Sequence, residues 1–134
     1  MITYLWIAIG SALGGAARYA LTLWAARAWG ETFPWGTLLI NVLGSFVIGL
    51  FFNLTMADGP LPASAHLRLF VMAGLCGGFT TFSAFSLQAL LLLRGGEWVS
   101  GFAYMAGSVV LCLAAVLLGH WLGARIGLAL TAGS

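Results

Sequence analysis

Four long apolar runs, separated by short polar breaks, restrict the fold of this chain more than any other feature of its sequence. Hydrophobic residues make up 62% of its 134 residues and charged residues only 6%. A helix needs about 20 mostly apolar residues to cross a membrane. The chain supplies four such runs: Thr3 to Ala26, Trp35 to Thr55, Leu67 to Leu93 and Val99 to Ile126. The sequence therefore predicts an all-α membrane protein, with residues 1–134 forming a single four-helix transmembrane domain.

The breaks between the runs carry residues that typically end helices. Glycine and proline lie within residues 30–34, two prolines within 58–62 and two glycines within 94–97. The three acidic residues of the chain, Glu31, Asp58 and Glu97, also lie in these breaks. The predicted spans therefore contain no carboxylate. The first run lacks the basic leader and cleavage site of a signal peptide, so we expect it to be kept.

Positive charge gives the chain no preferred orientation in a membrane. With four spans, both termini and the second connection share one side, where Arg68 and Arg125 lie. The first and third connections share the other side, with Arg27 and Arg94. Because basic residues in short loops set orientation, this balance predicts insertion in both directions. Four helices are also few for enclosing a pathway, so we expect an antiparallel homodimer in which one copy is inverted.

Polar side chains recur every four residues in the second and fourth runs. They are Thr37, Asn41 and Ser45 in the second run, and Tyr104, Ser108 and Cys112 in the fourth. This spacing places each set on one helical face. Ser and Thr in membrane helices often bond their own backbone carbonyls, so any one hydroxyl can equally be structural. Asn41 is harder to explain in this way, because its amide carries two donors and an acceptor.

The third run contains a stretch that is unsuited to a continuous helix, LCGGFTTFSAFSLQ at residues 75–88. Glycine, threonine and phenylalanine all have low helix propensity, so we expect the third span to be broken near its middle. A break in a membrane helix frees backbone N–H and C=O groups, which is tolerated where they are buried in protein or bind something. The freed carbonyls are suitable ligands for a small cation, and in an antiparallel dimer two breaks would meet at the two-fold axis.

Phe82 and Phe85 lie three residues apart after the expected break, and Phe79 lies three residues earlier, which would place all three on one helical face. These rings can simply pack against lipid or the core, or their positive edges can contact a dehydrated anion. Arg18 is the charge placed well inside a predicted span. It is either a structural residue that caps carbonyls or reaches the interface, or it attracts anions near a vestibule.

Three segments together resemble the Fluc fluoride channels, a family of small four-span membrane proteins. They are GGAARY at residues 14–19, GTLLINVLGSFVIG at 36–49 and GGFTTFSAFS at 77–86. The resemblance covers essentially the whole chain. It implies an antiparallel homodimer with two pores in the cell (inner) membrane, passive export of fluoride and a central structural sodium ion. The expected partners are fluoride, the lipid bilayer and a second copy of the chain, and no nucleic acid.

The resemblance also implies roles for individual residues. Gly77 and Thr80 match the positions whose backbone carbonyls hold the sodium ion. The positions matched to the fluoride pathway are Asn41, Thr81, Phe82, Ser83, Phe85, Tyr104 and Ser108, and Arg18 matches an arginine of the family. The chain departs from the family pattern at Ala84, where threonine is frequent, and at Gln88, where glutamate is frequent. Neither departure touches a phenylalanine or carbonyl position, so we expect altered rates or access and not a loss of function.

Other functions fit the residues less well. A proton-coupled exporter of organic cations needs an acid inside the membrane, and the predicted spans have none. No nucleophile arrangement, metal-ligand cluster or phosphate-binding glycine loop indicates an enzyme, and His66 and His120 lie near span ends without ligand partners. The alternatives that remain are another small-anion transporter and a structural membrane-assembly protein.

Overall fold

The structure, a computed structural model, describes residues 1–56 and 58–132, with the side chain of residue 131 left out. These residues form helices and connections only. The helices are α1 Ile2–Trp29, α2 Trp35–Thr55, α3 Ala65–Arg68, the π-helix η1 Leu69–Cys76, α4 Gly77–Phe79, α5 Phe82–Arg94 and α6 Trp98–Ala132. α3, η1 and α4 follow one another without a gap, and two residues, Thr80 and Thr81, separate α4 from α5. Together these elements form a third long segment, residues 65–94, beside α1, α2 and α6.

Three of the described segments are long and apolar enough to cross a membrane: Trp35–Thr55, Ala65–Arg94 and Trp98–Leu130. With 28 residues, α1 spans about 42 Å and exceeds the hydrocarbon core of about 30 Å. It is less apolar, however, and does not belong to these three. The prediction of an all-α protein with several membrane helices is confirmed, whereas a fourth span at α1 stays a prediction.

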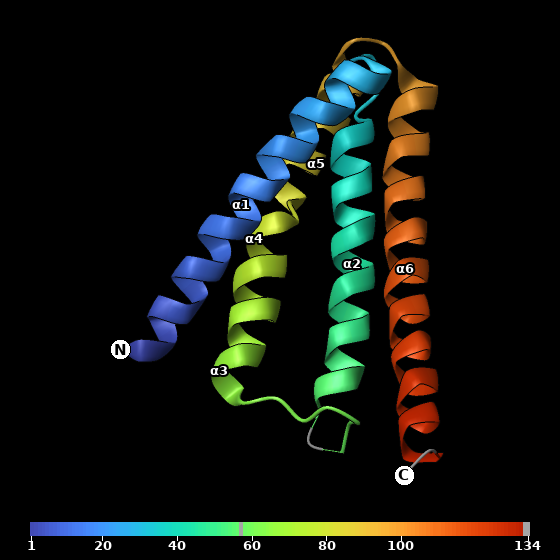
Figure 1. Cartoon of the computed structure of the whole chain (residues 1–134). Helices are drawn as coiled ribbons and strands as arrows, with labels where there is room; N and C mark the ends of the chain where they lie inside the picture. The colour runs from blue at the N-terminus through green and yellow to red at the C-terminus, as the bar shows by residue number, and fades with distance from the viewer. Residues whose placement is uncertain (57, 133–134) are drawn as a thin grey trace.

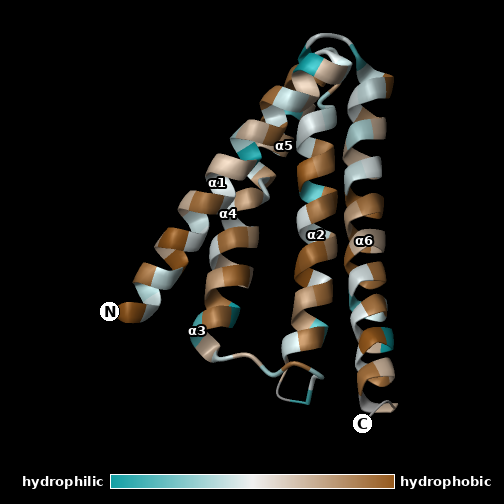
Figure 2. Ribbon diagram, in the orientation of Figure 1, coloured by the Kyte–Doolittle hydropathy of each residue, from teal (hydrophilic) through white to brown (hydrophobic). Residues whose placement is uncertain are grey.

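The four segments run up and down alongside one another (Figure 1). The α1–α2 and α5–α6 connections lie at one end, and the N-terminus, the α2–α3 connection and the end of α6 lie at the other. α2 and α6 run side by side, and α1 crosses the third segment. Hydrophobic residues cover most of each helix, and hydrophilic residues lie in the connections and at single positions along the helices (Figure 2). The up-and-down order of the four segments is the arrangement that the balance of positive charges assumes.

Glycines allow the helices to approach until their backbones touch. At Gly14 of α1, an added Cβ would overlap the carbonyl oxygen of Leu75 and lie 2.8 Å from the amide nitrogen of Phe79. At Gly119 of α6, an added Cβ would overlap the carbonyl oxygen of Phe46 in α2. Membrane helices associate largely through such close van der Waals contact. Glycine therefore sets the spacing of both helix pairs.

The third segment is interrupted at Thr80 and Thr81. Both residues have extended backbone conformations, with ψ 159° at Thr80 and φ −153°, ψ 113° at Thr81. The interruption lies within residues 75–88, where the sequence predicts a break. It also separates Phe79 from Phe82, so the expectation that Phe79, Phe82 and Phe85 share one helical face is wrong. An extended residue does not preserve the helical period of 3.6 residues.

Replacement of Gly14 by alanine tests the backbone contact between α1 and the third segment. Gly14→Ala is expected to destabilise the protein by about 1–3 kcal/mol, because the new methyl group must push two backbones apart. Gly15→Ala is the matched control, since an added Cβ there meets nothing within 4 Å. The thermal midpoint of the detergent-solubilised protein measures both changes. Equal midpoints for the two variants would contradict the proposed contact.

Candidate functional site

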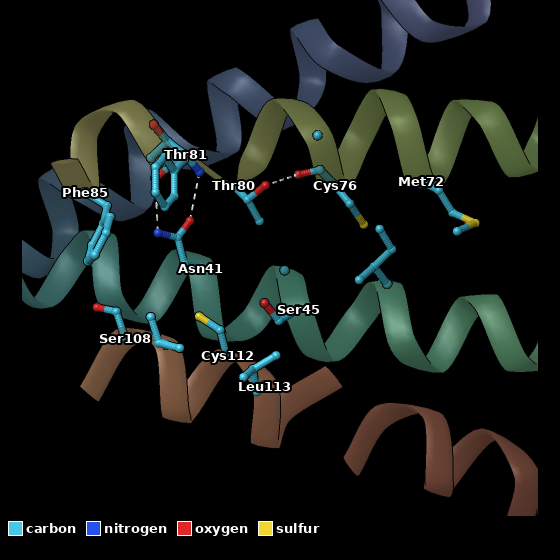
Figure 3. Close-up of a pocket in the computed structure, with 15 residues that line it drawn as sticks. Asn41, Ser45, Met72, Cys76, Thr80, Thr81, Phe85, Ser108, Cys112 and Leu113 are labelled. Atoms are coloured by element: carbon cyan, nitrogen blue, oxygen red, sulfur yellow. Dashed lines mark hydrogen bonds between the residues drawn. The ribbon is translucent and has the colours of Figure 1, made fainter. Parts of the chain in front are cut away.

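Asn41 of α2 forms hydrogen bonds with the backbone at the break. Its Oδ1 accepts a hydrogen bond from the Thr81 amide at 2.8 Å, and its Nδ2 donates to the Thr81 carbonyl at 3.1 Å (Figure 3). These two bonds satisfy a donor and an acceptor that the extended backbone removes from the helical ladder. Asn41 therefore has a structural role, and its place on an anion path stays a prediction. Of its two amide hydrogens, the bond to Thr81 uses one.

Threonine hydroxyls cap both sides of the break. Thr80 Oγ1 donates to the Cys76 carbonyl at 2.9 Å, at the end of the helix before the break. Thr81 Oγ1 accepts from the Ala84 amide at 3.2 Å and is the N-cap of α5, a position that threonine favours. The hydroxyls of Thr81 and Ser83 lie 3.3 Å apart. The threonine doublet thus ends one helix and starts the next.

The same hydrogen bonds take donors away from two backbone carbonyls. In a continuous helix, the Gly77 carbonyl would pair with the Thr81 N–H, and the Thr80 carbonyl with the Ala84 N–H. Here the Thr81 N–H donates to Asn41, and the Ala84 N–H donates to the Thr81 hydroxyl. Gly77 and Thr80, the two positions matched to sodium, therefore both lose their helical partner. Carbonyl oxygens freed in this way are the hard ligands that a small cation prefers.

Arg18 approaches the break from α1. Its Nη1 lies 3.5 Å from the Thr80 carbonyl oxygen, a long distance for a hydrogen bond. This position at the break favours the structural alternative for Arg18, a residue that caps a carbonyl. The contact also tests the implied sodium site. A carbonyl oxygen has two lone pairs, so an arginine contact at Thr80 leaves one direction for a further cation.

A first cavity, of about 440 Å³, lies between the break, α2 and α6 (Figure 3). Predicted site residues line much of it: Asn41, Gly77, Thr80, Thr81, Phe82, Phe85 and Ser108. The stripe residues Ser45 and Cys112 also lie in its wall. Arg18, Ser83 and Tyr104 do not line it. Met72 and Cys76 also line it, although neither is predicted from the sequence as a site residue.

Ser108 lines the first cavity with a buried hydroxyl. The residue is 5% exposed, and its Oγ has no hydrogen-bond partner among the described residues. Leaving a buried polar group unpaired costs about 1–3 kcal/mol, and such groups in native proteins require an explanation. A polar or ionic ligand in the cavity would supply the missing acceptor.

Aromatic rings connect the first cavity to Tyr104. The ring centroids of Phe82 and Phe85 lie 5.3 Å apart, and those of Phe85 and Tyr104 lie 5.2 Å apart. Phe82 is 78% exposed in the single chain, whereas Tyr104 is 1% exposed. The Tyr104 hydroxyl donates to Gln88 Oε1 at 2.9 Å. From the sequence, Gln88 is only a departure from the family pattern, and spacing along the chain does not predict this bond.

Removal of the Asn41 side chain tests its role at the break. Asn41→Ala leaves the Thr81 N–H and C=O without these partners, at a cost of about 1–3 kcal/mol. We expect hydrogen exchange of the amides around Thr81 to become about tenfold faster or more, measured by mass spectrometry. Ser45→Ala, one turn further along the same face of α2, is the control and should leave exchange there unchanged. Unchanged exchange in Asn41→Ala would show that Asn41 does not hold the break.

Comparison with known proteins places the chain in a family. The CrcB family, described as CrcB-like protein, Camphor Resistance, matches residues 5–120. A fluoride-specific ion channel FluC of Methylocella silvestris is 61% identical over 117 residues, covering 87% of this chain and 89% of the relative. The FluC proteins of Opitutus terrae and Paramagnetospirillum magneticum are 56% and 53% identical, each over 120 residues and 90% of this chain, and over 91% and 94% of the relatives. This chain therefore belongs to the CrcB family, a family of fluoride ion channels and not of enzymes.

Proposed function

We propose that this chain is a fluoride-selective channel that lets F⁻ leave the cytoplasm passively and so reduces fluoride toxicity. The names of its relatives support fluoride as the ion. The observation that carries the proposal is the buried, unpartnered hydroxyl of Ser108, a residue in the wall of a cavity that Phe82 and Phe85 also line. An anion that accepts a hydrogen bond would satisfy this hydroxyl.

Weak donors suit the passage of a small, strongly hydrated anion. A pore must replace part of the water shell without holding the ion too tightly. The first cavity offers the second amide hydrogen of Asn41, the Ser108 hydroxyl and the positive ring edges of Phe82 and Phe85. No charged side chain lines it among the described residues. Because no cationic side chain lines the wall, none holds an anion that enters.

A structural sodium ion at the break is the second part of the proposal. The carbonyls of Gly77 and Thr80 would hold it, because their helical donors are taken by Asn41 and Thr81. When bound, the ion would supply positive charge that offsets repulsion between anions at the centre. Over the described residues there is no cluster of three or more His, Cys, Asp or Glu side chains, so backbone oxygens are the ligands we propose.

We further propose that all four long segments span the cell (inner) membrane and that the protein works as an antiparallel homodimer. The charge balance between Arg68 and Arg125 on one side, and Arg27 and Arg94 on the other, supports insertion in both directions. Large apolar side chains are exposed along every segment of the single chain, as expected where lipid or a second copy covers them. An inverted partner would bring the two breaks together.

Two alternatives are less well supported. A proton-coupled exporter of cations needs an acid in the membrane, and Glu31, Asp58 and Glu97 lie in the connections between helices. A transporter for another small anion would share the same cavity. Comparison of fluoride and chloride flux in one liposome preparation separates it from a fluoride channel.

Replacement of Phe82 tests the anion path. Phe82→Ile keeps an apolar side chain but removes the ring edge, so we expect fluoride efflux from liposomes to be abolished while assembly stays intact. Phe102→Ile is the control, since Phe102 is also exposed on a helix but does not line the first cavity. A fluoride electrode measures both. Wild-type efflux in a folded Phe82→Ile protein would exclude this path.

The role proposed for sodium is also testable. A structural ion is not transported, so fluoride flux should be the same whether a sodium gradient points into or out of the liposomes. The gradient is reversed at constant total ionic strength, and initial rates are compared. Flux that follows the sodium gradient would show cotransport and would contradict a passive channel.

A further inference from the structure

A second cavity lies at the end of the bundle where the α1–α2 and α5–α6 connections meet. Its volume is about 370 Å³. Its wall includes Phe33 from the first of these connections, Thr37 from α2 and Gln88 from α5. Glu31 and Glu97, one from each connection, also line it. The proposed path through the first cavity does not account for this space.

Tyr104 separates the second cavity from the first. Its ring centroid lies 5.2 Å from that of Phe85, which lines the first cavity, and 5.5 Å from that of Phe33, which lines the second. Its hydroxyl donates to Gln88, in the wall of the second cavity. Tyr104 is almost fully buried and lines neither space. One aromatic side chain and its hydrogen bond therefore stand between the two cavities.

We infer that the second cavity is a mouth of the anion path, and that Glu31 and Glu97 in its wall slow the entry of anions there. This inference rests on the proposed function. An anion that passes Phe85 and Tyr104 from the first cavity reaches Gln88 and then the opening between the two connections. Tyr104 and Gln88 form the step that joins the mouth to the first cavity.

The negative charge of the second cavity would slow the entry of anions. Within the described part of the chain, its charged lining residues are Glu31 and Glu97. Arg27 and Arg94 lie at the same end of the bundle but do not belong to its wall. A cleft lined by charge of one sign focuses the electric field and changes the local concentration of ions. Two carboxylates lower the concentration of any anion, so they act on rate and do not distinguish one halide from another.

Ion selectivity and the rate of ion entry then depend on different parts of the channel. The uncharged first cavity removes water from the ion and thereby selects it, while the acidic mouth sets how often an ion arrives. Neutralising the mouth should raise fluoride and chloride entry by the same factor. A substitution that merely loosened the fold would instead change the ratio of fluoride to chloride flux.

The test compares initial fluoride efflux of the wild type with that of Glu31→Gln, Glu97→Gln and the double variant, all in liposomes. At an ionic strength of about 0.01 M, where charges act over about 30 Å, we expect about threefold faster efflux in the double variant. At about 1 M, where the range falls to about 3 Å, the difference should disappear. The fluoride-to-chloride ratio should stay at the wild-type value in both conditions.

Asp58→Asn is the matched control. It removes one carboxylate from the α2–α3 connection, which lies at the opposite end of the single chain (Figure 1) and outside the wall of the second cavity. In the proposed antiparallel dimer the partner's copy of this connection lies on the same membrane side as the cavity, so the variant should raise efflux less than the double variant does. Equal efflux of the wild type and the double variant at low ionic strength would overturn the inference. So would an increase in Asp58→Asn as large as in the double variant, or a gain that persists at high ionic strength. Absence of fluoride efflux in the wild type would instead refute the proposed function.

Discussion

The pairing of Asn41 with the backbone of Thr81 is the interaction on which the rest of the site depends. A helix in hydrocarbon cannot be interrupted unless each freed N–H and C=O finds a partner, because no water is available there. One asparagine side chain supplies an acceptor and a donor to the same residue, at 2.8 and 3.1 Å. An aspartate would lack the donor, and a serine would be too short to present both groups in this way. Asn41 thus satisfies the N–H and C=O of Thr81 within one chain, while the Gly77 carbonyl loses its helical donor.

The same pairing organises charge on both sides of the break. Because side chains take the amide hydrogens of Thr81 and Ala84, the carbonyls of Gly77 and Thr80 are released together. Their partial negative charge favours a cation, and Arg18 already lies 3.5 Å from one of them. On the other side, α5 restarts and directs its phenylalanines to the first cavity. The proposed cation and anion sites are therefore two consequences of one set of hydrogen bonds.

The fold could be predicted from the sequence further than the site could. Length and apolarity were sufficient to locate α2 and the other long segments, because the bilayer imposes a minimum span. Glycine and threonine content was sufficient to place the break within residues 75–88. Phe79 does not share the face of Phe82 and Phe85, since helical periodicity does not continue across extended residues. Spacing along the chain also leaves the role of Arg18 open and does not predict the bond from Tyr104 to Gln88. Contacts between helices depend on how the segments rotate and slide against one another, which sequence spacing along a single helix does not determine.

The position of Gln88 supports the expectation that the departure from the family pattern there does not abolish function. Its Oε1 accepts the Tyr104 hydroxyl, a bond that a glutamate oxygen would accept equally well. The geometry that holds the Tyr104 ring between the two cavities is therefore independent of the charge at residue 88. What the charge would change is the field experienced by an anion at the mouth, where Glu31 and Glu97 already contribute two carboxylates. Because Gln88 is neutral, an anion that passes Tyr104 meets no third negative charge there.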